Sequence, residues 1–312
     1  MSDAKFVVSS SPHTHAELDT QKIMAWVLIA LAPAGLHGIY VYGIRSAAVM
    51  AVCVASCVFF EWLWQKSTGR DVTIGDLSAA VTGLMLAYNL PVTIPYWMAV
   101  VGSAFSIIVV KQFYGGIGCN ILNPALAGRA FMLASWPVAM THWSLDGITS
   151  ATPLAILKEN AGAALPSMTE LLLGHVGGCI GEACPIALLI GFAILLWKDI
   201  IKWHIPVVYI LATGLFCFAF GSPAPVVDML SGGLFLGAIF MATDYTTTPV
   251  TRKGQVIFAL GCAFITSAIR KWGAYPEGVS YSILIMDLMV PLIDRAFVPH
   301  IFGQAKGAKK NA

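Results

Sequence analysis

Residues 23–42 read IMAWVLIALAPAGLHGIYVY, and residues 46–64 read SAAVMAVCVASCVFFEWLW. Each run is about 20 residues long, the length that an α-helix needs to cross the hydrocarbon core of a membrane. The two runs together contain a single charged residue, Glu61. They therefore predict two adjacent transmembrane helices.

The composition of the whole chain agrees with this prediction. Of its 312 residues, 58% are apolar and only 11% are charged, and the mean hydropathy is +0.78. A soluble domain carries about 25% charged residues. Because so few charges cannot cover a surface that faces water, we expect the lipid bilayer to be the solvent of this chain. The net charge is only +2 and no basic stripe exists, so no nucleic-acid partner is expected.

Eight further apolar runs follow, so we predict an all-α, polytopic membrane protein of about ten transmembrane helices. The ten expected spans are 23–42, 46–64, 76–90, 96–113, 124–140, 184–198, 205–221, 228–243, 255–271 and 280–298. The spans 76–90, 184–198 and 228–243 are short for a full crossing. Such short spans are expected to begin inside the protein or to be interrupted.

The distribution of basic residues predicts the orientation of the bundle, because cytoplasmic segments carry an excess of Lys and Arg. With the N-terminal segment numbered zero, the even segments hold 13 basic residues and the odd segments hold 5. The even-segment residues are Lys5, Lys22, Lys66, Arg70, Lys111, Lys198, Lys202, Arg252, Lys253, Arg295, Lys306, Lys309 and Lys310, and the odd-segment residues are Arg45, Arg129, Lys158, Arg270 and Lys271. We therefore expect both termini in the cytoplasm and the long loop after the fifth span outside.

The two halves of the chain also resemble each other. Asp76-Leu-Ser78 and Asp228-Met-Leu-Ser231 each open a short, glycine-containing span. Asn89 and Asp244 end those spans near a proline, and Lys111 and Arg270 end the long spans that follow. The offset is about 153–159 residues throughout. Because five spans per half is an odd number, the two copies are expected to be inverted, with a site near the midplane, as in transporters. The alternative is chance similarity between apolar segments.

These observations divide the chain into five parts. We expect a cytoplasmic N-terminal segment at 1–22, a first five-helix half at 23–140 and an extracytoplasmic loop at 141–183. A second five-helix half at 184–298 and a cytoplasmic tail at 299–312 follow.

The stretch GGIGCNILNPALAGRAF at 115–131 includes the loop after the span 96–113 and the start of the span 124–140. Its glycines, Gly115, Gly116 and Gly118, allow backbone to approach a ligand closely. Asn123 precedes Pro124 at an expected helix start, where backbone N–H groups face an anion. Arg129 lies one turn inside an apolar span, where arginine is costly and marks a functional site. The alternative is that Arg129 snorkels to a phospholipid headgroup.

Four acids are candidates for an ion path, because ionisable groups inside membrane spans need a partner or a proton. They are Glu61, Asp76, Asp244 and Asp287. Asp244 stands among four threonines that offer oxygen ligands, although a plain helix terminus would have a similar sequence. Three cysteines, Cys119, Cys179 and Cys184, lie in loops or at helix ends, and their spacing is not that of a metal site. No catalytic residue and no metal site are predicted, although a metal or redox role for these three stays open.

The stretch DGITSATPL at 146–154 taken alone reads as a turn or a helix cap. Together with GGIGCNILNPALAGRAF, ATDYTTTPVTRKGQ (242–255) and YPEGVSYSILIMD (275–287), it gives the chain its resemblance to the RnfD and NqrB family. This family comprises membrane subunits of ion-translocating redox complexes, and the resemblance covers about 20–298.

The resemblance implies FMN bonded through its phosphate to a threonine hydroxyl. The family pattern matches Asp146, Thr149, Ser150 and Ala151 before the acceptor, which is Thr152. Ser150 stands where the family more often has Gly, so Thr149 and Ser150 remain alternative acceptors. Arg129, Gly115, Gly116, Gly118 and Asn123 are candidates for holding the flavin. The family attaches FMN outside the cytoplasmic membrane, which agrees with the orientation from the basic residues.

The resemblance further implies a function and partners. The chain is expected to be a multi-pass subunit of an Rnf-type complex in the bacterial cytoplasmic membrane. It would couple electron transfer between ferredoxin and NAD to Na⁺ or H⁺ transport, with no complete active site of its own. Other Rnf subunits and a flavin transferase are the implied partners, and a non-covalent riboflavin is a second implied cofactor. The alternatives are a secondary transporter of a small solute and a scaffold that carries no ion.

Overall fold

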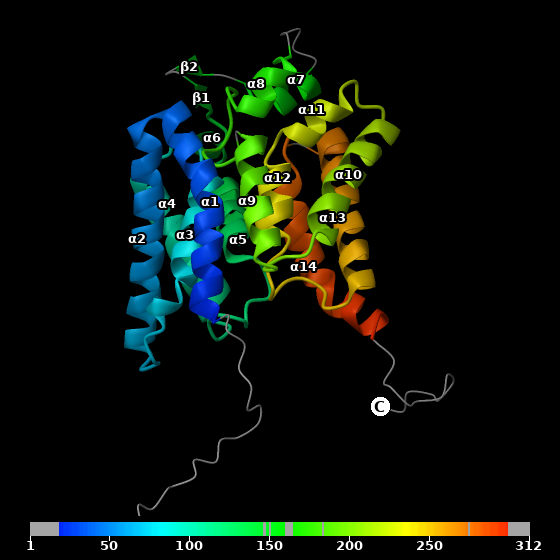
Figure 1. Ribbon diagram of the computed structural model, residues 1–312. Helices are drawn as coiled ribbons and strands as arrows, with labels where there is room; N and C mark the ends of the chain where they lie inside the picture. The colour runs from blue at the N-terminus through cyan, green and yellow to red at the C-terminus, as the bar shows by residue number, and fades with distance from the viewer. Residues whose placement is uncertain are drawn as a thin grey trace, which may run out of the picture.

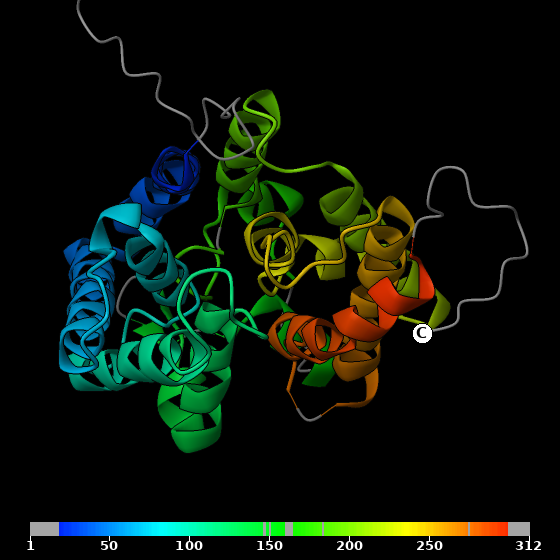
Figure 2. The ribbon, with the colours of Figure 1, turned by 90° about the horizontal axis from the view of Figure 1, so that it is seen from below.

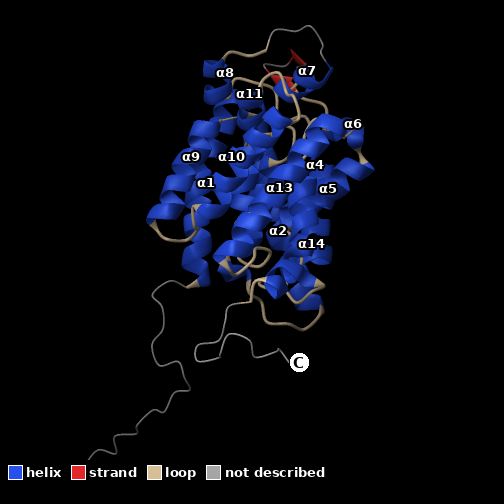
Figure 3. Cartoon of the chain, turned by 90° about the vertical axis from the view of Figure 1, so that its right-hand side faces the viewer, coloured by secondary structure: helices blue, strands red, loops and turns tan. Residues whose placement is uncertain are grey.

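The computed structural model describes residues 19–145, 148–149, 151–159, 165–182, 184–273 and 275–298. Within these ranges the chain is helical, apart from one small hairpin (Figure 3). The hairpin pairs β1 (Ser144–Leu145) with β2 (Ile148–Thr149) in antiparallel register. The expected all-α class is therefore confirmed for the described part of the chain.

The first two helices lie where the opening sequences predict them. They are α1 (Thr20–Tyr42) and α2 (Ile44–Ser67), and both are long and apolar enough to cross a membrane. Gly43 alone separates them, with a φ of +74° that L side chains rarely adopt. The four shorter apolar helices cover Ser78–Tyr88, Tyr96–Gln112, Pro185–Trp197 and His204–Ala219.

The other expected spans also coincide with helices, in one or more pieces. In the first half these are η1 (Ile74–Asp76), α3 (Ser78–Tyr88), α4 (Tyr96–Ala104), η2 (Phe105–Gln112), α5 (Pro124–Ser135) and α6 (Pro137–Met140). Two short helices, α7 (Pro153–Glu159) and α8 (Met168–Leu173), lie between the halves. The second half contains α9 (Pro185–Trp197), α10 (His204–Ala219), α11 (Pro225–Leu230), α12 (Leu234–Leu236), η3 (Gly237–Met241), α13 (Arg252–Trp272) and α14 (Val279–Ala296).

Two of the expected spans are not continuous helices. The span 124–140 breaks at Trp136, because Pro137 cannot donate the backbone hydrogen bond that would continue α5. The span 228–243 breaks between α11 and α12, where Gly232 and Gly233 have φ values of +72° and +69°. The interruption of this short span was expected, whereas the break at Trp136 was not.

The long helices stand roughly side by side, with short elements gathered at one end (Figure 1). The hairpin, α6, α7, α8 and α11 lie at the upper end in that view. The start of α1 and the end of α14 lie at the lower end, so both ends of the described chain are on the same side. Viewed from below, α2 to α5 lie on one side of the molecule, and α10, α13 and α14 on the other (Figure 2).

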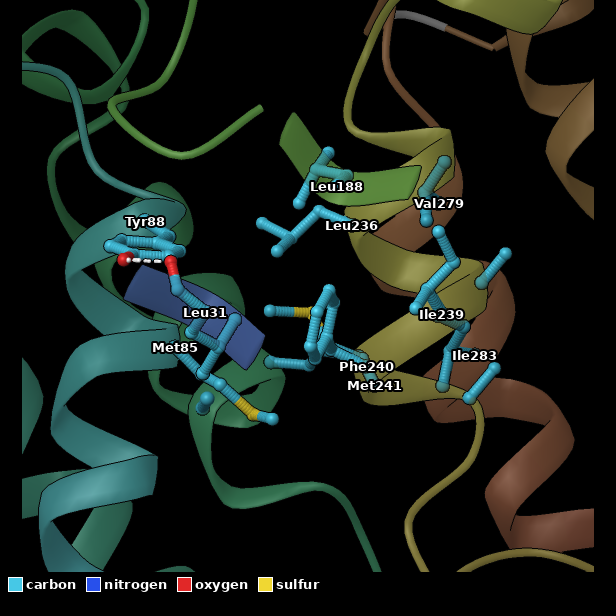
Figure 4. Packing of buried hydrophobic residues seen from close by; sticks show 14 of the residues in the cluster. Leu31, Met85, Tyr88, Leu188, Leu236, Ile239, Phe240, Met241, Val279 and Ile283 are labelled. Carbon is cyan, nitrogen blue, oxygen red and sulfur yellow. Dashed lines mark hydrogen bonds between the residues drawn. The ribbon is translucent and has the colours of Figure 1, made fainter. Parts of the chain in front are cut away.

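The two halves meet through corresponding helices. The first helices of the halves, α1 and α9, pack on each other, and so do the last ones, α5 and α14. Within the first half, Tyr88 of α3 donates a hydrogen bond to the backbone oxygen of Leu31 of α1, at 2.8 Å (Figure 4). Met85 of α3 faces Phe240 and Met241 of η3 in the same view. The core therefore joins both halves rather than forming one core in each.

Matched positions of the sequence repeat make matched contacts. Lys111 Nζ donates to Ser78 Oγ at 2.6 Å, and Arg270 Nη2 donates to the backbone oxygen of Ser231 at 3.0 Å. In each half, the basic residue that ends the long helix therefore forms a hydrogen bond with the serine that starts the short span in the repeat. The ends of the short helices also meet, since Asn89 Nδ2 lies 3.6 Å from Met241 Sδ.

Candidate functional site

Thr152 precedes α7 and lines a cavity of about 430 Å³. Its side chain is 4% exposed, and its hydroxyl accepts a hydrogen bond from the backbone N–H of Ala155 at 3.2 Å. The threonine therefore acts as a helix cap and also lines the cavity. Its expected role as a cap does not conflict with its expected role as a flavin attachment site. The polar and aromatic residues that line the same cavity are Arg129, Thr141, His142, Trp143, Tyr275, Glu277, Ser280 and Tyr281.

The other residues of the expected attachment motif are less completely described. Asp146 and Ser150 lie outside the described residues. Thr149 belongs to β2, where only its backbone is described. The roles expected for these three residues therefore stay predictions.

Arg129 connects the cavity to the centre of the bundle. It lies on α5, is 5% exposed, and forms an ion pair with Glu277. Its guanidinium also donates to Ser280 Oγ at 2.8 Å and to Asn89 Oδ1 at 3.3 Å. Because these partners are buried protein groups, the alternative that Arg129 snorkels to a lipid headgroup is wrong.

The glycine loop lies elsewhere. Gly118 and Asn123 line a second cavity of about 240 Å³, on the side of the bundle where α1 begins. Gly115, Gly116 and Gly118 have φ values of +126°, +101° and +83°, which explains the choice of glycine in this turn.

Asn123 caps α5, accepting from the backbone N–H groups of Ala125 and Leu126 at 3.1 and 3.3 Å. Six residues of helix, a rise of about 9 Å, separate this cap from Arg129. The structure therefore does not bring the glycine loop and Asn123 to the Thr152 cavity, which corrects the expectation that they share one site.

Two of the four candidate acids belong to one buried network. Glu61 is 1% exposed and accepts from Lys111 Nζ at 2.8 Å and from Gln112 Nε2 at 2.7 Å. Lys111 also donates to Ser78 Oγ, which in turn donates to Asp76 Oδ1 at 2.6 Å. Ser78 and Lys111 line the second cavity, so this network borders it.

The other two acids lie close to the start of α5. Asp287 of α14 is 2% exposed and accepts from the backbone N–H of Asn123 at 3.0 Å. Asp244 accepts from the backbone N–H and the hydroxyl of Thr246, at 3.3 and 3.2 Å, and lines the second cavity. All four candidate acids therefore lie at or near the second cavity, and none of them lines the Thr152 cavity.

Two residues around Arg129 are not identified by sequence reasoning: Glu277 occurs in a motif without being marked by it, and Glu182 matches no motif. Cys179, a third neighbour, is one of the loop cysteines whose metal or redox role the sequence leaves open. The segment Gly177-Gly-Cys-Ile-Gly-Glu182 is a polar, glycine-rich run before an apolar span, and this is the one local signal that points to it. Its contacts with Arg129 depend on packing between distant segments.

Comparison of the sequence with known proteins assigns the chain to a family. The model of the NQR2, RnfD, RnfE family matches residues 7–303. The chain belongs to this family. The D-type subunit of the Na⁺-translocating ferredoxin:NAD⁺ oxidoreductase complex of Acetobacterium woodii is 49% identical, over 99% of each chain.

Two further relatives carry related names. The D-type subunit of the proton-translocating ferredoxin:NAD⁺ oxidoreductase complex of Clostridium ljungdahlii is 43% identical, over 96% of each chain. The D-type subunit of the ion-translocating oxidoreductase complex of Escherichia coli is 33% identical, over 97% of this chain and 99% of the relative. The resemblance found in the sequence motifs is therefore confirmed over nearly the whole chain.

Proposed function

We propose that this chain is the RnfD-type membrane subunit of an ion-translocating ferredoxin:NAD⁺ oxidoreductase complex. The observation that carries the proposal is the near-complete match to the corresponding subunits of two such complexes. The chain works with the other subunits of the complex, because each of these relatives is named as one subunit of a multi-subunit complex. Ferredoxin and NAD are handled by those partners.

We further propose that Thr152 carries FMN through a phosphoester, attached by a flavin transferase. Three features of the cavity beside Thr152 support a flavin. Its volume of about 430 Å³ lies in the range of small-molecule sites. Thr152 and the cationic Arg129 both lie in its wall. Tyr275 and Tyr281 lie nearly parallel, with ring centroids 6.4 Å apart, as an aromatic surface for a planar ring.

Each of these residues has a distinct role in this proposal. Thr152 holds the cofactor at one depth, and Tyr275 and Tyr281 limit its rotation. Arg129 forms an ion pair with Glu277 at the cavity wall, and its Nε–H has no hydrogen-bond partner among the described residues, so this donor is available to a polar group of the cofactor. Bound FMN supplies the electron-transfer chemistry, while the protein supplies position and electrostatics.

The second cavity is the candidate place for the non-covalent flavin, riboflavin. Its walls are largely apolar, with Met24, Val27 and Phe240 among them. Asn120, Asp244 and Thr246 offer hydrogen-bonding groups in the same cavity. This combination of apolar walls and few polar groups suits a neutral ring with a hydroxylated chain.

The membrane arrangement is part of the proposal. Ten helices or broken helices cross the bacterial cytoplasmic membrane as two inverted five-helix repeats, with both termini in the cytoplasm. The packing of α1 on α9 and of α5 on α14 supports this, since a two-fold relation between halves pairs corresponding helices. The 141–183 loop, which contains Thr152, then lies outside.

Na⁺ or H⁺ passes through the bundle in this proposal, and the acids near the second cavity are candidates for its path. The test uses Asp244→Asn and Asp287→Asn in the assembled complex. Each change should lower ion transport more than flavin content. If transport in both variants equals that of the unaltered complex, these two acids are not on the path.

A mass spectrum of the peptide around residues 142–158 tests the flavin attachment. We expect an FMN adduct on Thr152 in protein from cells with an active flavin transferase. Thr152→Val should abolish the adduct, while the matched Thr149→Val should keep it. An unmodified Thr152 would contradict the proposal, and an adduct on Thr149 would move the attachment there.

A secondary transporter of a small solute is the second candidate. Transporters also contain interrupted helices beside a central binding site, and this chain has both an interrupted short helix and the second cavity. Fluorescence of the denatured protein in a gel distinguishes the two functions. A flavin band supports the redox subunit, whereas solute uptake by flavin-free protein in vesicles would support the transporter.

A further inference from the structure

A second cluster of ionisable groups lies behind Arg129. It consists of Cys179, Glu182 and Glu277, whose ligating atoms all lie within 4.8 Å of one another. Cys179 and Glu182 come from the segment before α9, and Glu277 from the segment before α14. The cluster therefore connects the segments before α9 and before α14 to Arg129 on α5.

One oxygen of this cluster has no donor. Glu182 Oε1 accepts from the backbone N–H of Cys179 at 2.9 Å, but the buried Oε2 has no hydrogen-bond partner among the described residues. The Glu182 side chain is only 9% exposed. A buried carboxylate oxygen without a donor is unfavourable unless something neutralises it.

The charges around Glu182 are unbalanced. The groups that face it are Arg129, Glu277, Cys179 and Tyr42. Two carboxylates and one guanidinium leave one negative charge, since the thiol and the phenol are neutral. The Cys179 thiol is also occupied, because it donates to the backbone oxygen of Asn89 at 3.3 Å. One positive charge is therefore missing from the buried cluster.

We propose that Glu182 and Glu277 form a binding site for one monovalent cation, a proton or Na⁺, on the inner side of the Thr152 cavity. The spacing fits either ion. Oxygens within 4.8 Å of each other can both reach a cation at about 2.4 Å. They can also share a proton, either directly or through a water molecule.

The position of this site gives it a role in coupling. Glu277 and Arg129 line the Thr152 cavity, and Arg129 also contacts Asn89 at the end of α3. An electron that enters the cavity adds a negative charge, which favours uptake of a cation at Glu182. The inference rests on the proposed function, because it supplies the counter-charge for the proposed flavin.

The first experiment does not need the flavin. Dicyclohexylcarbodiimide adds to protonated carboxyl groups in apolar surroundings, and the adduct is located by mass spectrometry of the purified complex. We expect an adduct on Glu182 that decreases as the pH rises. If Na⁺ is the bound ion, adding Na⁺ but not K⁺ should also suppress the adduct.

The second experiment measures the midpoint potential of the Thr152-bound flavin against pH and Na⁺ concentration. We expect a change of about 59 mV per tenfold change in the bound ion for a one-electron step. Glu182→Gln should remove this dependence, while Glu170→Gln, a change of an exposed glutamate, should keep it.

The outcomes separate this inference from the proposed function. Glu182 that does not react with carbodiimide at any pH or Na⁺ concentration would overturn the cation site. An unchanged ion dependence in Glu182→Gln would do the same. A missing FMN adduct on Thr152 would instead overturn the proposed function, while the carbodiimide result would still decide the cation site.

Discussion

At the scale of the residue, Arg129 has the most consequential contacts in the described chain. Its partners Asn89, Cys179, Glu277 and Ser280 come from three different segments. A guanidinium suits this position because its planar donors reach several acceptors at once. Its loss would leave a buried carboxylate unpaired.

Arg129→Gln is therefore expected to lower both stability and flavin content. Breaking a buried ion pair by removing one partner costs about 3–5 kcal/mol. Thermal unfolding in detergent measures the first effect, and flavin absorbance per chain the second. The double variant Arg129→Gln/Glu277→Gln should recover stability but not flavin content. Unchanged flavin content and electron transfer in Arg129→Gln would show that this residue does not serve the cavity.

The buried Glu61–Lys111 pair leads to a second prediction. Glu61→Gln leaves the Lys111 ammonium, which is 3% exposed, with no carboxylate at hydrogen-bonding distance among the described residues. We expect a loss of about 3–5 kcal/mol in the free energy of unfolding. Adding Lys111→Met should restore much of it, because the remaining buried charge is then gone. A double variant less stable than Glu61→Gln would contradict this explanation.

At the scale of the element, small residues decide how closely the helices approach. A Cβ on Gly83 of α3 would lie 2.8 Å from the backbone oxygen of Cys53 and from the Cα of Val54. These are backbone atoms of α2, which cannot move away as a side chain can. The close packing of α2 and α3 therefore requires glycine at this position.

Gly83→Ala is expected to destabilise the bundle by about 1–3 kcal/mol, because it overpacks this contact. Gly75→Ala is the matched control, since a Cβ there meets nothing within 4 Å and should change stability by less than about 0.5 kcal/mol. Melting temperatures of the two variants in the same detergent compare them directly. Equal values would show that α2 and α3 can separate at no cost.

At the scale of the whole molecule, the orientation of the bundle in the membrane can be tested at one exposed position at each end of the bundle. Cys119 is the exposed one of the seven cysteines, and it lies in the loop that leads into α5. Thr169 of α8 is exposed and lies at the opposite end of the bundle (Figure 1). In the proposed membrane arrangement, the two positions therefore report on opposite sides.

A membrane-impermeant maleimide tests this orientation. We expect Cys119 to react in inverted membrane vesicles and not in intact cells whose outer barrier is permeable. Thr169→Cys in a Cys119→Ser background should show the reverse pattern. Labelling of both positions from the same side would contradict the two-sided arrangement.

The sequence by itself determined the helices, their order and the family. Hydropathy is a local signal, so the ten expected spans coincide with helices, whole or broken. The positions that the repeat matches at an offset of about 153–159 residues make corresponding contacts, which only the structure shows. Thr152 was assigned by its motif, and its attachment remains a prediction.

Only the tertiary structure decided which polar residues meet. Arg129 and Glu277 are 148 residues apart, and neither spacing nor periodicity brings them together. The structure also separates the glycine loop from Thr152. It places Glu182 near Arg129, with no hydrogen-bond partner for Glu182 Oε2 among the described residues. The physical reason is that hydropathy acts on each helix alone, whereas a buried charge is paired by whichever distant segment the packing brings within hydrogen-bonding distance.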